Sequence, residues 1–183
     1  MKLFREVNTQ SDGQLQNDVD AIVYWANHWQ MQFNAGKCKV VHYGKNNVAC
    51  KDCKYSMCGQ PLKEVKTEKH LGIVFSSNRK VETQCREAYC RASRMLGLIN
   101  RVIRYKNPTV VINFYKSLVR PHLEYCSVVW NPYYMKDTTL LERVQHRFTR
   151  LLLDLRDLPY EERPKRLGLW CCGPWKKGAT QLT

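Results

Sequence analysis

Residues 81–103 read VETQCREAYCRASRMLGLINRVI, and this stretch decides the fold of the second half of the chain. Apolar residues return along it at steps of three and four, which is the period of an amphipathic α-helix. The apolar seam consists of Cys85, Tyr89, Ala92, Leu96, Ile99 and Ile103. Four arginines, Arg91, Arg94, Arg101 and Arg104, fall on the other side. The pattern predicts a helix with one face in a core and a basic face in solvent.

Two more helices are predicted after this one. Asn107-Pro108 is a typical helix start, and the helix that follows is expected to break or kink at Arg120-Pro121. Asp137 is expected to cap a last helix. The core stripe of that helix is Leu141, Val144, Phe148, Leu151 and Leu155, and a basic stripe is formed by Arg143, Arg147 and Arg150.

The N-terminal part mixes a helix with strands. Ser11 and Gln14 have the spacing of a capping box, and a helix is expected from there to about residues 34–36. Its core positions are Leu15, Val19, Ile22, Ala26, Trp29 and Phe33. Strands are predicted at 39–43 and 71–75, with a weaker one at 54–57 before a turn at Gly59-Gln60-Pro61. Together they predict a small antiparallel sheet beside the first helix.

These patterns predict an α+β protein, in which a mixed part precedes an all-helical bundle. The expected boundaries are 1–77 for the mixed part, 78–170 for the helical part, and 171–183 for a disordered tail. The tail is predicted because periodicity stops after Trp170, where the sequence continues with Cys171-Cys172-Gly173-Pro174.

The net charge indicates which class of partner to expect, and the cysteine content indicates in which cellular compartment the chain is expected. The 183 residues carry a net charge of +14, which favours a polyanion such as nucleic acid. The basic residues are spread over several helices, whereas an anionic membrane surface attracts one concentrated cluster, so no membrane partner is expected. Nine cysteines are an odd number, and the chain shows no apolar leader, so a reducing cytoplasmic or nuclear environment is expected.

Five segments, in this order, carry a resemblance to a known family. They are Met1-Lys2-Leu3-Phe4, Trp25-Ala26-Asn27-His28-Trp29, the segment 33–40 (FNAGKCKV), His70-Leu71-Gly72-Ile73, and the segment 118–126 (LVRPHLEYC). The series resembles the second half of a reverse transcriptase encoded by jockey-like non-LTR (LINE) retrotransposons. The resemblance covers roughly residues 1–170. It implies the end of a polymerase palm, a hairpin around Leu71-Gly72 that grips the primer, and a helical thumb and connector.

The resemblance also implies what this chain lacks. In the family, an aromatic-Ala-Asp-Asp tetrapeptide comes directly before a segment similar to Lys2-Leu3-Phe4, and its aspartates hold the catalytic Mg²⁺ ions of the intact enzyme. The chain is therefore expected to be inactive as an RNA-directed DNA polymerase. A family lysine that protonates the departing pyrophosphate corresponds to Lys37, although Lys39 fits equally well and a solvated lysine at the start of a strand is the simpler interpretation.

Cys50, Cys53 and Cys58 are candidate zinc ligands, since thiolates at this spacing can approach one ion. The spacing offers no fourth ligand, and only His42 or His70 could complete a site after folding. Free thiols in a surface hairpin are the favoured interpretation, so no cofactor is expected in this fragment.

Nucleic-acid binding is the function that the arginines favour. Arg91, Arg94, Arg101, Arg104, Arg143, Arg147 and Arg150 are expected to contact phosphates, with Tyr105 and Tyr115 as exposed aromatics nearby. The expected partner is an RNA or RNA–DNA duplex of any sequence. The alternatives are a helical protein-interaction module and the non-functional product of a decayed element.

Overall fold

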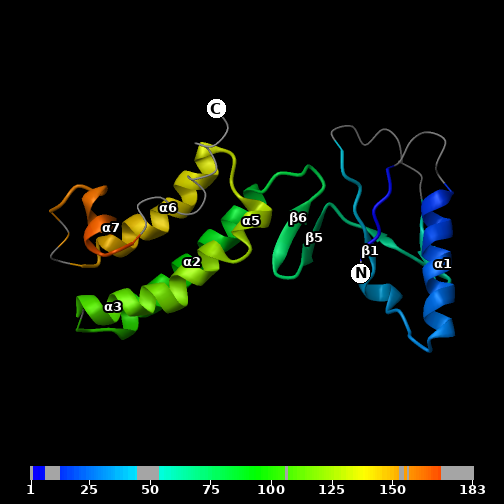
Figure 1. Ribbon diagram of the computed structural model, residues 1–183, viewed down its shortest axis with the longest axis horizontal. Coiled ribbons are helices and arrows are strands. Elements are labelled where there is room, and N and C mark those ends of the chain that lie inside the picture. The colour runs from blue at the N-terminus through cyan, green and yellow to red at the C-terminus, as the bar shows by residue number, and fades with distance from the viewer. Residues whose placement is uncertain are drawn as a thin grey trace. The chain divides into compact units, whose positions relative to one another are not determined.

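The computed structural model describes residues 2–6, 13–44, 54–105, 107–152, 155 and 157–169 (Figure 1). It divides into two units, Met1–Lys80 and Val81–Thr183, each of which is described by itself. The first mixes helix and strand, and the described part of the second is helical, so the predicted α+β class is confirmed. The predicted tail at 171–183 lies outside the described residues.

In its described residues, unit 1 has one long helix and three two-stranded sheets. β2 pairs with β3 and β5 with β6, both antiparallel, whereas β1 runs parallel to β4. The single predicted sheet is thus replaced by separate short ladders. The elements are α1 (Gln14–His28), the 3-10 turn η1 (Ala35–Lys37), β1 (Lys39–Val40), β2 (Ser56–Met57), β3 (Gln60–Pro61), β4 (Lys63–Glu64), β5 (Thr67–His70) and β6 (Ile73–Ser76).

Two tight turns shift the strands from their predicted places. Leu71 and Gly72 both have positive φ, 48° and 81°, and form the two-residue turn of the β5–β6 hairpin. Cys58 and Gly59, at 51° and 75°, do the same between β2 and β3. Positive φ at both central residues is typical of the turn that matches strand twist. The strand predicted at 71–75 therefore begins at Ile73, and Gln60-Pro61 is a strand instead of a turn.

Helix α1 is shorter than predicted. It begins after Gly13, which makes no side-chain cap, while Ser11 of the predicted capping box lies outside the described residues. It ends at His28 because Gln30 takes a left-handed conformation, with φ 56°, and the Met31 N–H donates to the Ala26 carbonyl at 2.8 Å. Trp29, predicted as a core residue, is 61% exposed as a result.

All the regular secondary structure in the described part of unit 2 is helical. The helices are α2 (Glu82–Val102), α3 (Pro108–Phe114), the π-helix η2 (Tyr115–Val119), α4 (Arg120–Glu124), α5 (Ser127–Trp130), α6 (Met135–Thr149) and α7 (Glu162–Arg166). Cys85, Ala92, Leu96 and Ile99 of the predicted α2 seam are buried. Tyr89 and Ile103 are half-buried at its edges.

The start of α3 is as predicted, and the α-helix is interrupted directly before Arg120-Pro121, although the chain stays helical. The Asn107 side chain accepts a hydrogen bond from the Thr109 N–H at 3.0 Å, as an N-cap does. Pro121 does not end the helical path. The chain widens into the π-helix η2 and restarts as α4, which places Pro121 in a first turn, where its missing N–H breaks no helical bond.

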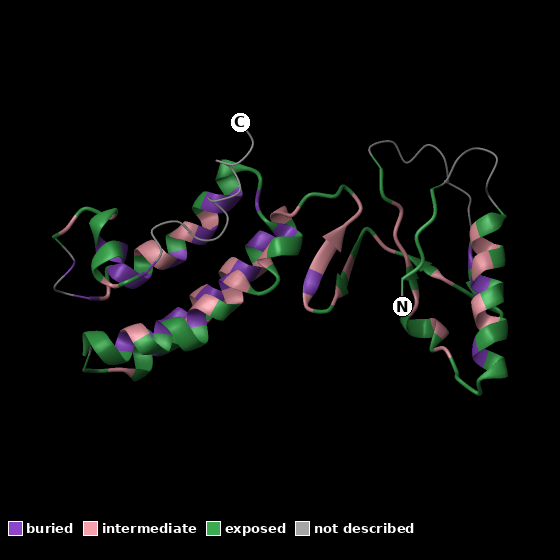
Figure 2. Ribbon diagram, in the orientation of Figure 1, coloured by how far each residue is buried: buried purple, intermediate pink, exposed green. Residues whose placement is uncertain are grey.

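The core of unit 2 lies where α6 packs against α2 (Figure 1). Buried positions recur along both helices between exposed ones (Figure 2). Phe148 of α6 is fully buried and stacks on Tyr115, with ring centroids 4.0 Å apart. Asp137 does not cap α6 as predicted. It lies in the first helical turn, is 3% exposed, and the residue before the helix is Tyr134.

The buried Cys85 gives a chemical test of this core. Burial, with the charge of Asp137 as a smaller cause, raises the pKa of its thiol to about 12. Since the thiolate is the reactive form, we expect Cys85 to resist iodoacetamide at pH 8 in the folded protein and to react in urea. Cys90 on the same helix is exposed and serves as the control. Peptide mass spectrometry reads both sites, and equal labelling of the two in the folded protein would contradict the packing.

Candidate nucleic-acid interface

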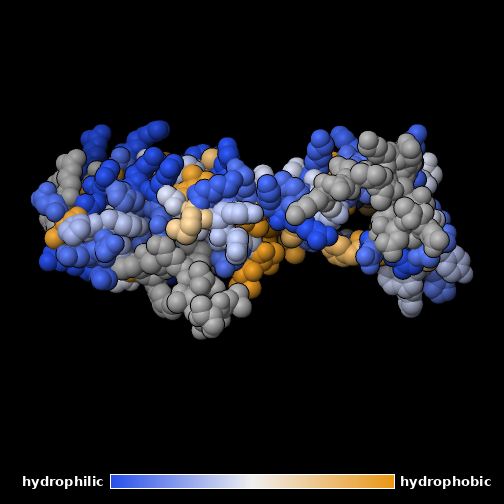
Figure 3. All heavy atoms as spheres, turned by 90° about the horizontal axis from the view of Figure 1, so that it is seen from above, coloured by the Kyte–Doolittle hydropathy of each residue, from blue (hydrophilic) through white to orange (hydrophobic). Residues whose placement is uncertain are grey.

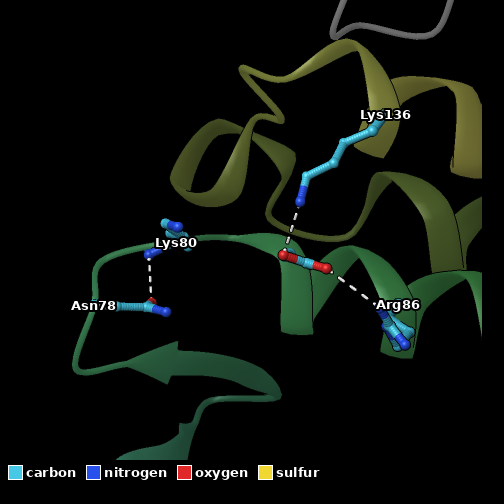
Figure 4. A network of polar contacts seen from close by, with 5 residues as sticks. Asn78, Lys80, Arg86 and Lys136 are labelled. Atoms are coloured by element: carbon cyan, nitrogen blue, oxygen red, sulfur yellow. Dashed lines mark hydrogen bonds and ion pairs between the residues drawn. The ribbon is translucent and has the colours of Figure 1, made fainter.

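Some basic residues of unit 2 form ion pairs with carboxylates. Glu82 accepts from Lys136 Nζ at 2.9 Å and from Arg86 at 3.2 Å (Figure 4). The bond and charge of Lys136, and then those of Arg86, hold the pKa of Glu82 below its usual value. Two further i,i+4 pairs join Arg91 to Glu87 and Arg120 to Glu124. A carboxylate already neutralises part of each of these charges.

Six of the seven predicted contact arginines have no carboxylate partner among the described residues. On α2 and just beyond it lie Arg94, Arg101 and Arg104, which we call the α2 row. On α6 and at its end lie Arg143, Arg147 and Arg150, which we call the α6 row. All six are exposed, so their guanidinium groups are available to an external anion.

Helical geometry fixes the direction of each row. Arg94 and Arg101 lie two residues beyond the buried Ala92 and Ile99, which is about 200° around a helix of 3.6 residues per turn. Arg143 and Arg150 have the same offset from the buried Leu141 and Phe148 on α6. Each row therefore points away from the core that α2 and α6 share. Arg104 lies past the end of α2, so its predicted place on the helix face is wrong.

Two other residues of the predicted nucleic-acid interface, Arg91 and Tyr115, differ from expectation. Arg91 is paired with Glu87, and its side chain is 32% exposed, so less of its charge is available. Tyr115 is 2% exposed because its ring packs on Phe148, so its predicted exposure is wrong. Burial raises the pKa of its hydroxyl. Tyr105, in contrast, is 85% exposed, close in sequence to Arg101 and Arg104.

Lys37 and Lys39, the two lysines that could correspond to the family's general acid, have different surroundings in unit 1. Lys37 is an exposed residue at the end of η1, and Lys39 is bound to Glu68 at 2.7 Å. Asp18 pairs with Arg5 at 3.4 Å, and Asp20 accepts from Gln16 at 2.8 Å. The two carboxylates thus serve different partners.

The remaining ligand predictions are only partly covered by the structure. Cys50 and Cys53 lie outside the described residues, and Cys58 is exposed in the β2–β3 turn. In the part of the chain that the structure describes, no group of three metal-binding side chains comes together. None of the described helices has the length and apolarity needed to cross a bilayer.

His146 of α6 makes the stability of unit 2 depend on pH. Its ring lies 4.6 Å from that of Tyr160. Burial, and then the charges of Arg150 and Arg163, lower its pKa from the usual 6.5. The unfolded chain therefore takes up the proton more readily, so this contribution to stability is complete above about pH 6.5 and decreases as the pH falls below it.

We expect the urea midpoint of the wild type to fall more steeply between pH 7.5 and pH 5.5 than that of His146→Gln. Circular dichroism at the two pH values gives the comparison. Other groups titrate equally in both proteins, so the difference isolates His146. Parallel pH dependence in wild type and variant would mean that the pKa of His146 is not lowered.

Side-chain pairing was the feature that sequence reasoning missed. Glu87 stands four residues before Arg91, which is a helix ion-pair spacing and could have separated Arg91 from the α2 row.

In comparisons with family models, with curated proteins and with solved structures, nothing matches the chain.

Proposed function

We propose that the chain derives from the end of the palm and the thumb of a non-LTR retrotransposon reverse transcriptase, and that it binds RNA or RNA–DNA duplexes without regard to sequence. The ordered motifs of the sequence support the origin. The observation that carries the binding role is the set of six exposed arginines without carboxylate partners among the described residues.

The chemistry of the rows suits phosphates better than bases. Guanidinium groups bind phosphate oxygens by charge and by paired hydrogen bonds, and such contacts carry no sequence information. In the view of Figure 3, hydrophilic side chains cover much of the surface and hydrophobic ones gather in a few small areas. The six exposed arginines add positive charge to the surface of unit 2, which attracts a duplex of any sequence.

Binding, and not nucleotide addition, is the role that we propose for this chain by itself. Phosphoryl transfer between nucleotides uses two metal ions held by shared carboxylates. Asp18 and Asp20 are engaged with Arg5 and Gln16, respectively. Lys37 is proposed only as a relic of the family's general acid.

Fluorescence anisotropy with labelled RNA–DNA hybrids tests the proposal. Two hybrids of unrelated sequence should bind with equal Kd, and a plot of log K against log salt should fall with a slope of about −3, since a row of three arginines releases about three counterions. A tenfold preference for one sequence would overturn sequence independence. Absence of binding at 50 mM salt would overturn the proposed function itself.

Protein binding is the second candidate, because unit 2 also exposes apolar side chains. Val128, Tyr133 and Met135 are 95%, 90% and 71% exposed. Exposed apolar clusters often mark interaction sites. Replacing these three residues with serine should leave the anisotropy curves unchanged if nucleic acid is the partner.

A further inference from the structure

We infer that one chain binds two nucleic-acid molecules at once, one on the α2 row and one on the α6 row, and so bridges them. This inference rests on the proposed function. It starts from the direction of the rows, since Arg94 and Arg101 point away from the core on one side, and Arg143 and Arg150 do so on the other.

Each row is long enough to hold a strand on its own. Arg94 and Arg101 are seven residues apart, as are Arg143 and Arg150, which is about 10 Å along a helix. One strand of a duplex passes a phosphate every 3.4 Å or so along its axis, so about three phosphates lie beside each row. Either row can therefore form a separate electrostatic contact.

A single duplex cannot reach both rows. Packed helices lie about 8–10 Å apart, and each is about 10–12 Å wide with its side chains, which puts the outer sides of the pair roughly 20 Å apart. Duplex DNA has a persistence length of about 500 Å, far more than this separation, so a double helix that lies undistorted along one row does not wrap round to the other. The second row remains open to a second molecule.

Repulsion between the two bound molecules does not prevent this arrangement. At physiological salt the Debye length is about 8 Å, well below the separation across the helix pair. The packed core, including Phe148 and Tyr115, fills the space between α6 and its neighbours. The chain is thus expected to hold two polyanions apart at a fixed distance while linking them.

Two row variants test the inference on the full chain. One carries Arg94→Gln, Arg101→Gln and Arg104→Gln, and the other carries Arg143→Gln, Arg147→Gln and Arg150→Gln. A charge-matched control carries Gln at the ion-paired Arg86, Arg120 and Lys136. All three lose the same net charge, so any difference among them reports position and not total charge.

The readouts are native mass spectrometry for stoichiometry and energy transfer between two short hybrid duplexes that carry donor and acceptor dyes. Wild type and control should bind two duplexes and give energy transfer. Each row variant should bind one duplex, lose the transfer, and bind within about twofold of the wild-type Kd, because one site remains.

The outcomes separate the inference from the proposed function. One duplex per wild-type chain at saturation overturns bridging and leaves duplex binding in place. Row variants that still bridge would also overturn it, because self-association would then be the cause. No binding in any protein would overturn the proposed function. Circular dichroism of the variants, whose substituted residues are all exposed in the two rows, verifies that they are folded.

Discussion

Replacing Phe148 with alanine is expected to lower the free energy of unfolding of unit 2 by roughly 3–5 kcal/mol. The side chain is fully buried and stacks on Tyr115 at 4.0 Å with planes 16° apart, so its removal leaves a cavity and an unpaired ring. The total free energy of unfolding of a folded domain is about 5–15 kcal/mol. The variant should therefore be partly or wholly unfolded at 37 °C.

Urea unfolding followed by circular dichroism measures the loss, and Phe114→Ala is the matched control. Phe114 lies on α3, 40% exposed, and its truncation should cost less than about 1 kcal/mol. Equal losses in the two variants would mean that the Phe148–Tyr115 stack is not the core of unit 2.

The helices of unit 2 were predictable because their signals are local. The seam through Cys85, Ala92, Leu96 and Ile99 needs only the 3.6-residue period, and Asn107 needs only its own side chain to cap α3. Neither depends on distant residues. The same local pattern places Arg94 and Arg101 on the side of α2 that faces away from the seam.

The errors in the fold come from contacts and backbone states that have no local signal. Gln30 and Leu71 adopt positive φ, which sequence patterns assign to glycine or asparagine, so the end of α1 and the β5–β6 turn were misplaced. The burial of Tyr115 depends on Phe148, which is more than thirty positions away in the sequence. The local pattern around Tyr115 does not show this contact, and it therefore predicts an exposed side chain. Pairings of this kind are decided by tertiary packing.

In the candidate interface, too, some features follow from the local sequence and others depend on tertiary packing. Sequence indicated two basic stripes, but the direction of one relative to the other depends on α2 packing against α6 through their seams. Because of that packing, we expect the two stripes to form two separate surfaces. It also makes the removal of both rows a different experiment from the removal of either one.

Removal of all six row arginines is expected to weaken duplex binding by on the order of 100-fold at 0.15 M salt. Each site then loses about three phosphate contacts, and the log-log salt slope should approach zero, with about one unit lost per contact. Thermal stability should barely change, because all six side chains are exposed.

The control for this variant removes six charges elsewhere. Gln at Arg86, Arg120, Lys136, Lys63, Lys66 and Lys80 also lowers the net charge from +14 to +8, but touches neither row. If the rows contact phosphates, this control keeps most of the wild-type salt slope, because contacts and not net charge set the number of released counterions. If both six-charge variants flatten the slope equally, binding follows overall charge, and the rows are ordinary solvated helix faces.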